Sequence, residues 1–171
     1  MIEVRVQSLG LDRTSNTPVV IEPSCMAQVN AFRFCLPEAR QSTLLINIGA
    51  RSSNLVFLRE DRYFVRNVTL AGGSLSQAMA DEIGAGAGEA ERAKLEIVRN
   101  LGRSALPEGQ VRAFESARST CVAKLSLEIT RSIANYRRQT SAETPTRVLL
   151  TGAGASVPEL VPMLADRLKI P

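Results

Sequence analysis

The sequence predicts an α/β fold in which helices pack against a mixed β-sheet. Three features of the 171-residue chain lead to this prediction. Two apolar runs flank a glycine turn in "TLLINIGARSSNLVFL", residues 43–58, and a third run follows a charged turn. A long amphipathic segment spans about 109–139, and one more apolar run, 147–151, comes after it. Because helices separate this last run from the others, it must return to the sheet through a crossover.

The first predicted elements are a strand and a helix. The β-branched stretch "TPVVIEP", residues 17–23, indicates a short strand that ends at Pro23. Ser24 is expected to be the N-cap of the following helix, "CMAQVNAFRFCL", and Pro37 is expected to end it.

Residues 43–70 are expected to form an antiparallel meander. Its three strands would be 43–48, 54–59 and 63–70, joined by the glycine turn and by the charged turn "REDRY".

Helices are expected after the meander. One follows the pair Gly72–Gly73 and carries apolar residues one turn apart, Leu75, Met79 and Ile83. The stretch "GAGAG", 84–88, breaks it, and another helix starts at Glu89.

The long helix at about 109–139 has an apolar, core-facing stripe: Val111, Phe114, Val122, Leu125, Ile129, Ile133 and Tyr136. The loop "QTSAETPT" ends this helix. The strand 147–151, the turn "GAGASVP" and a helix through Leu160, Leu164 and Leu168 follow. This order of elements is typical of ribonuclease-H-like domains.

Composition argues against several classes of function. The net charge of +4 comes from scattered basic residues and aromatic residues make up only 4%, so nucleic-acid binding is not expected. No apolar run reaches the roughly 20 residues of a membrane-spanning helix. The N-terminus lacks the apolar core of a signal peptide, which favours a cytoplasmic location. Histidine is absent and Cys25, Cys35 and Cys121 lack metal-ligand spacing, so we expect buried free thiols and no metal site.

Three glycine-containing turns have patterns that resemble those of anion sites. At Gly49 the backbone could approach a ligand closely, and the amides near Ser52 and Ser53 could bind an anion; the alternative is a tight hairpin with solvated hydroxyls. "TGAGAS" lacks the third glycine of a dinucleotide-binding turn. "GAGAG" has no following Lys-Ser/Thr, so it is not a P-loop.

Taken in order, these segments resemble the actin-like ATPase superfamily, and within it the C-terminal half of PilM-type proteins of type IV pilus and related secretion assembly, which are relatives of FtsA. "LLINIGARSSNLVFLREDRYFVRNVTLAGGSLSQAMADEI" resembles that family's second phosphate-binding hairpin and its Gly-Gly-x-x-(Thr/Ser) segment. "EAERAK" is similar to its Ala-Glu-x-x-Lys, and "LLTGAGASVPELVPMLADRL" to its adenosine-binding turn.

The resemblance implies a nucleotide site that takes ATP with Mg in the intact protein. The implied phosphate-side residues are Asn47, Gly49, Ala50, Arg51 and Ser52. The implied ribose and base residues are Glu91, Lys94, Gly152, Ala153 and Gly154. The alternative for Glu91 and Lys94 is a surface pair one helical turn apart.

Asn47 departs from the family pattern, which usually has an aspartate that helps to hold a metal-bound water. An amide has no charge to attract magnesium and is not a base, so hydrolysis is not expected and no catalytic residue is assigned. Ala153 replaces a usual glycine. Arg51 is large for a phosphate loop, although it could itself pair with phosphate.

The family's first half has no counterpart before residue 43. Residues 1–41 are expected to be the last strand and connecting helix of that half, and 42–171 the second half, with a helical insertion at about 71–108. The chain would then be either a fragment or a shortened relative. The resemblance places the groove for a PilN-like cytoplasmic peptide largely in the first half, so neither this peptide nor nucleotide is expected to bind tightly to this chain alone. Residues 1–36 are expected to be displaced, to pair with another copy or to fold back on the meander, because their strand would lack neighbours.

The resulting prediction is a cytoplasmic scaffold of a pilus or secretion platform, held at the inner face of the membrane by its partners, with nucleotide as a conformational ligand. An active ATPase or sugar-kinase-like phosphotransferase is the alternative. An adaptor that has lost nucleotide altogether is a third class.

Overall fold

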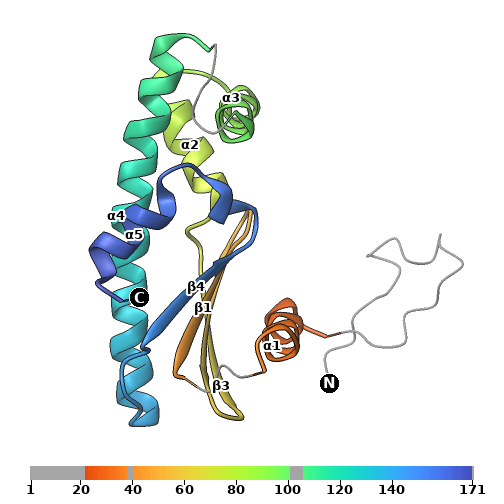
Figure 1. The fold of residues 1–171 in the computed structure, drawn as a ribbon. Coiled ribbons are helices and arrows are strands. Elements are labelled where there is room, and N and C mark those ends of the chain that lie inside the picture. The colour runs from red at the N-terminus through yellow and green to blue at the C-terminus, as the bar shows by residue number, and fades with distance from the viewer. Residues whose placement is uncertain (1–21, 38–40, 101–105, 171) are drawn as a thin grey trace, which may run out of the picture. The chain divides into compact units, whose positions relative to one another are not determined.

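The computed structural model describes residues 22–37, 41–100 and 106–170 (Figure 1). They belong to two compact units, one ending at Leu36 and the other beginning at Pro37.

The first unit contains α1 (Ser24–Cys35). The predicted N-cap was wrong by one position, because Ser24 is already helical and Pro23 is the cap. The Pro23 carbonyl accepts hydrogen bonds from the amides of Met26 and Ala27, which starts the helix one residue early. The helix ends before Pro37, as predicted. Apart from Glu22, which is not in a strand, the strand predicted at 17–22 lies outside the described residues.

The second unit is built on a four-stranded mixed sheet of order β3-β2-β1-β4. The strands β1 (Thr43–Ile48), β2 (Ser53–Arg59) and β3 (Arg62–Val68) form the predicted antiparallel meander. The last strand, β4 (Arg147–Thr151), pairs in parallel with β1, as the predicted crossover requires. The charged turn is shorter than predicted, so β3 starts at Arg62 instead of Tyr63. The strand also ends earlier than predicted, at Val68 instead of Leu70.

Helices fill the connections. They are α2 (Gly72–Ile83), α3 (Ala87–Arg99), α4 (Glu108–Thr140), a 3-10 helix η3 (Ala153–Ser156) and α5 (Leu160–Leu168). Gly84 ends α2 in the left-handed conformation, so "GAGAG" does separate two helices. Two starts differ from the prediction, since α2 includes the Gly72–Gly73 pair and α3 begins at Ala87 instead of Glu89.

The core lies between α4 and one face of the sheet. The predicted stripe of α4 is buried at Phe114, Val122, Leu125, Ile129 and Tyr136. It belongs to the same apolar cluster as alternate residues of the two central strands: Leu44, Ile46, Ile48, Leu55 and Phe57. Tyr136 stacks on Phe57, with ring centroids 4.5 Å apart. The sheet lies along the C-terminal part of α4, and α2 packs on its N-terminal part (Figure 1). Among the described helices, none is at once long and apolar enough to cross a membrane.

Candidate functional site

Two of the predicted turns lie side by side at the carboxyl ends of β1 and β4. These strands are parallel, with Asn47 opposite Thr151. The chain therefore leaves both strands at the same edge of the sheet, into the turn Gly49–Ser52 after β1 and into the segment Gly152–Gly154 after β4.

The turn Gly49–Ser52 is tight and leaves amides unpaired. The amide of Gly49 donates to the carbonyl of Ser52 at 3.1 Å. A Cβ on Gly49 would lie 2.8 Å from that carbonyl oxygen, so the turn requires glycine here. Among the described residues, the amides of Ala50, Arg51 and Ser52 donate to no protein acceptor. Ala50 and Arg51 are exposed, so the turn presents successive free donors to solvent.

The Gly72–Gly73 pair docks on this turn. The amide of Gly72 donates to the Gly49 carbonyl at 2.9 Å, and the amide of Gly73 donates to the Ala50 carbonyl at 2.8 Å. A Cβ on Gly73 would lie 2.9 Å from the Ala50 oxygen. The first amides of α2 are therefore used to hold the turn.

Glu91 and Lys94, on α3, reach the start of α2. The Lys94 ammonium donates to the Gly72 carbonyl at 3.1 Å and to Glu91 Oε2 at 2.8 Å. Glu91 Oε2 also accepts a hydrogen bond from Ser76 Oγ. The pair is thus not a simple surface pair, because the Lys94 side chain is only 9% exposed whereas that of Glu91 is 42% exposed.

The Glu91 carboxyl is held ionised. Burial raises its pKa, but the hydrogen bonds from Lys94 and Ser76 and the charge of Lys94 outweigh burial, so the pKa lies below its ordinary value. Glu91 is an acceptor at neutral pH.

Gly152 and Gly154 bring the second turn onto β1. Gly152 has φ +84°, and a Cβ there would lie 2.6 Å from the Ile48 carbonyl oxygen. A Cβ on the buried Gly154 would lie 2.7 Å from the Ile48 Cβ. The missing side chains thus allow close packing of the turn on β1. Ala153, between them, is exposed. Whether these residues contact a nucleoside stays a prediction.

Asn47 lies in a row of polar residues across the sheet. It is paired with Asn54 of β2 and Thr151 of β4, and Asn54 is paired with Asn67 of β3. The Asn67 amide donates to Asn54 Oδ1 at 2.9 Å. Asn47 is half-buried and its Oδ1 lies against Gly152.

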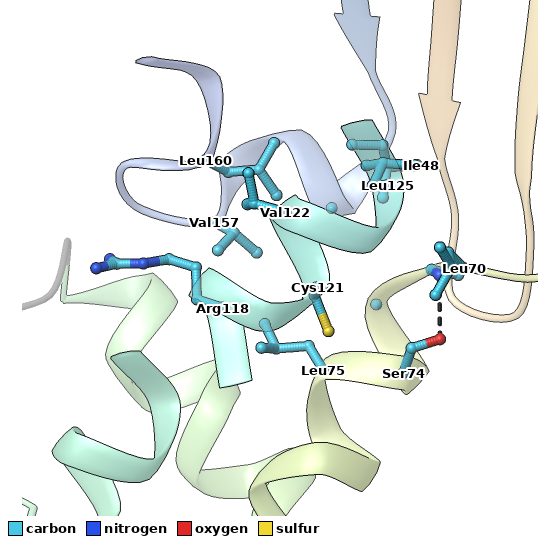
Figure 2. A pocket seen from close by; sticks show the side chains of 13 residues that line it. Ile48, Leu70, Ser74, Leu75, Arg118, Cys121, Val122, Leu125, Val157 and Leu160 are labelled. Carbon is cyan, nitrogen blue, oxygen red and sulfur yellow. Dashed lines mark hydrogen bonds between the residues drawn. The ribbon is translucent and has the colours of Figure 1, made fainter. Parts of the chain in front are cut away.

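An apolar pocket lies next to both turns, among the start of α2, α4 and the η3–α5 segment (Figure 2). Ile48 and Gly154 contribute to its wall, as do Leu75, Cys121 and Val157. Arg118 of α4 lines it and donates to the Pro158 carbonyl at 3.1 Å. Sequence reasoning missed Arg118 and Ser76. The signal in the sequence for these two residues is that each is a polar residue close to apolar residues on its helix.

Hydrogen bonds link Lys94 to Gly72 and Gly72 to Gly49. Ile48, which precedes Gly49 in the chain, lies in close contact with Gly152 and Gly154. Arg51 makes no such contact and is exposed at the tip of its turn.

Solved structures of actin-like proteins have the same fold. An archaeal actin homolog aligns with 86% of this chain and 48% of its own, at 13% identity and a TM-score of 0.60. MreB 5 of Spiroplasma citri, solved bound to AMPPNP, aligns with 97% of this chain and 57% of its own, at 17% identity and a TM-score of 0.59. The chain therefore has the ribonuclease-H-like fold of the actin-like ATPase superfamily, as predicted.

A chain of a PilM–PilN type IV pilus biogenesis complex is more similar in sequence, at 27% identity. It aligns with 90% of this chain and 41% of its own, with a TM-score of 0.72. The sequence profile of type IV pilus assembly protein PilM matches residues 2–171. The chain belongs to this PilM family. It spans less than half the length of the matching chain in that complex. No curated protein sequence matches it significantly.

Proposed function

We propose that this chain is part of an actin-like scaffold of a type IV pilus or related secretion platform, and that the scaffold binds ATP as a conformational ligand. The observation that carries the proposal is the group of free amides at Ala50, Arg51 and Ser52, beside the Gly152–Gly154 turn. Successive unpaired backbone amides are a common way to bind phosphate oxygens. The exposed guanidinium of Arg51 would add a charge-assisted donor at the same place.

Glu91 supports the nucleoside part of the proposal. Its carboxylate is ionised and partly exposed, and its Oε1 has no hydrogen-bond partner among the described residues. A carboxylate of this kind accepts hydrogen bonds from vicinal hydroxyls such as those of ribose. Ala153 would present a small apolar surface to the nucleoside, because it is exposed between the two glycines.

Asn47 favours binding over hydrolysis. Its side chain lies at the end of β1, next to the turn with the free amides. A neutral amide can orient a water but can neither take its proton nor attract the magnesium ion that accompanies ATP. The ligand would then stabilise one conformation of the scaffold without being consumed.

The partner proposed is a cytoplasmic peptide of a PilN-like membrane protein. Its support is the similarity to a chain of the PilM–PilN complex, of which this chain covers 41%. Such a partner would hold the scaffold at the inner face of the membrane. Self-association through residues 1–36 is a second contact that we propose.

Calorimetry with ATP and magnesium, followed by a phosphate-release assay, tests the nucleotide proposal. The titration is run on this chain and on the longest natural protein that contains it. We expect heat of binding in the longer protein, weaker binding in this chain, and no phosphate release. Absence of heat in both proteins would contradict the proposal and would support the third class, an adaptor that does not bind nucleotide.

The second candidate function is an active ATPase or sugar-kinase-like phosphotransferase. Phosphate release by the natural protein would favour it, and Asn47→Asp would then raise turnover only modestly. Under our proposal the natural protein is inactive, and Asn47→Asp increases the magnesium dependence of ATP binding because it adds a charge next to the turn.

A further inference from the structure

The turn Gly49–Ser52 has free donors, whereas most of its backbone acceptors are used inside the protein. The carbonyls of Gly49 and Ala50 accept from the start of α2, and the carbonyl of Ser52 accepts from Gly49. The amides of Ala50, Arg51 and Ser52 are the groups that remain open. A ligand at this turn therefore meets N–H groups before it meets carbonyl oxygens.

The asparagines beside the turn have the same bias. Asn47 Oδ1 lies against Gly152, and Asn54 Oδ1 accepts from the Asn67 amide at 2.9 Å. Neither Asn47 Nδ2 nor Asn54 Nδ2 donates to an acceptor among the described residues. In both side chains the oxygen is occupied and the NH₂ group is free.

No acidic residue offsets these donors within the strands and turns concerned. Residues 43–58 and 147–157 contain neither Asp nor Glu, and Arg51 adds a positive charge at the tip of its turn. Glu91 reaches the start of α2, but Lys94 balances its charge at 2.8 Å. In the part of the chain that the structure describes, no group of three or more His, Cys, Asp or Glu side chains could hold a metal ion.

This set of groups does not fit the magnesium that the family resemblance implies. In proteins Mg²⁺ takes oxygen ligands, usually one or two carboxylates together with waters and substrate phosphates. Free amides and a guanidinium instead match the oxygens of a bare phosphate. A metal ion on the phosphate would also occupy oxygens that these donors can bind, and its charge would lie near Arg51.

We propose that this chain binds the phosphates of its nucleotide as the free anion, without magnesium, and that the amide groups of Asn47 and Asn54 take the place of the metal. The inference rests on the proposed nucleotide binding and specifies the ionic form of the ligand.

Titration with inorganic pyrophosphate tests the inference, because pyrophosphate has the phosphate groups without the nucleoside. The chain is titrated at equal ionic strength in EDTA and in excess magnesium chloride. NMR shifts of the Ala50, Arg51 and Ser52 amides report binding. We expect the metal-free anion to bind about tenfold more tightly, which corresponds to one charge-assisted hydrogen bond. Equal affinities, or tighter binding of the magnesium complex, would overturn the inference.

Two variants with the same change in net charge separate the site from the overall charge of +4. Asn47→Asp places a carboxylate next to the turn and should reduce the preference for the metal-free anion to about twofold or less. Asn100→Asp, at the exposed end of α3, is the matched control and should keep the full preference. Equal changes in the two variants would show that net charge alone sets the preference, which contradicts the inference. If Asn47→Asp does not fold, the comparison of the two buffers in the unaltered chain still decides.

ATP in the same two buffers distinguishes failure of this inference from failure of the proposed function. If both compounds shift these amides only with magnesium, nucleotide binding holds and the inference alone fails. If neither compound shifts them in either buffer, nucleotide binding by this chain fails together with the inference.

Discussion

The side-chain oxygen of Asn47 lies so close to Gly152 that it would clash with a Cβ atom at position 152. Gly152 has a φ of +84°, which side-chain-bearing residues rarely adopt. The turn after β4 can therefore approach β1 this closely only with glycine at position 152.

Gly152→Ala is expected to destabilise the protein by about 1–3 kcal/mol, because it adds both a clash and backbone strain. Urea unfolding measures the change. Gly88→Ala is the matched control, since it lies in α3 and a Cβ there meets nothing within 4 Å. The control should lose no stability. Equal midpoints for Gly152→Ala and the unaltered chain would contradict the described packing.

Tyr136→Ala should cost about 3–5 kcal/mol, because the ring is buried and stacks on Phe57. Tyr63→Ala is the comparison, since Tyr63 is exposed on β3. It should change the free energy of unfolding by less than about 1 kcal/mol. Similar losses at the two positions would show that α4 does not pack on the sheet through Tyr136.

Acid should destabilise the protein partly through Glu91. The pKa of Glu91 in the folded protein lies below its ordinary value of 4.5, so the unfolded chain binds the proton more tightly. The contribution of Glu91 is therefore complete above the unfolded pKa and is lost as the pH falls through the folded pKa. Unfolding midpoints in urea between about pH 6 and pH 3 should fall less steeply in Glu91→Gln than in the unaltered chain. Glu89→Gln, at an exposed position of the same helix, should follow the unaltered chain. Parallel curves for all three proteins would argue against the hydrogen bonds from Lys94 and Ser76.

Cys121 should react slowly with thiol reagents. Burial raises the pKa of its thiol despite the nearby charge of Lys124, which reduces the reactive thiolate. Cys35 is exposed. Mass spectrometry after brief treatment with iodoacetamide should find Cys35 alkylated about tenfold or more faster than Cys121. The difference should disappear in urea. Equal rates in the folded protein would mean that the pocket beside Cys121 is open to the reagent.

Much of the fold could be predicted because its patterns are local. The strands β1 and β4 have the predicted bounds, since each is a short apolar run between turn signals. The stripe of α4 likewise follows from helical spacing, and Phe114, Val122 and Tyr136 are buried as expected.

The contacts inside the site could not be predicted in the same way. Lysine usually lies at the surface, and nothing near Lys94 in the sequence indicates that its ammonium group donates to a carbonyl 22 residues earlier. The inclusion of Gly72 and Gly73 in α2 depends on acceptors in the turn after β1, which are also distant in sequence. Local propensity disfavours glycine in helices, and tertiary hydrogen bonds outweigh it here.

The parallel pairing of β1 with β4 also bears on the order of biosynthesis. The meander can form from neighbouring residues as soon as it leaves the ribosome. In contrast, β4 is made only after α4, and it pairs with β1 from a distant position in the sequence. Until then Ile48 lacks the turn that packs against it. The turns after β1 and after β4, which form the two sides of the candidate site, therefore meet late in folding. A nascent chain would then bind the ligand only after β4 has paired with β1.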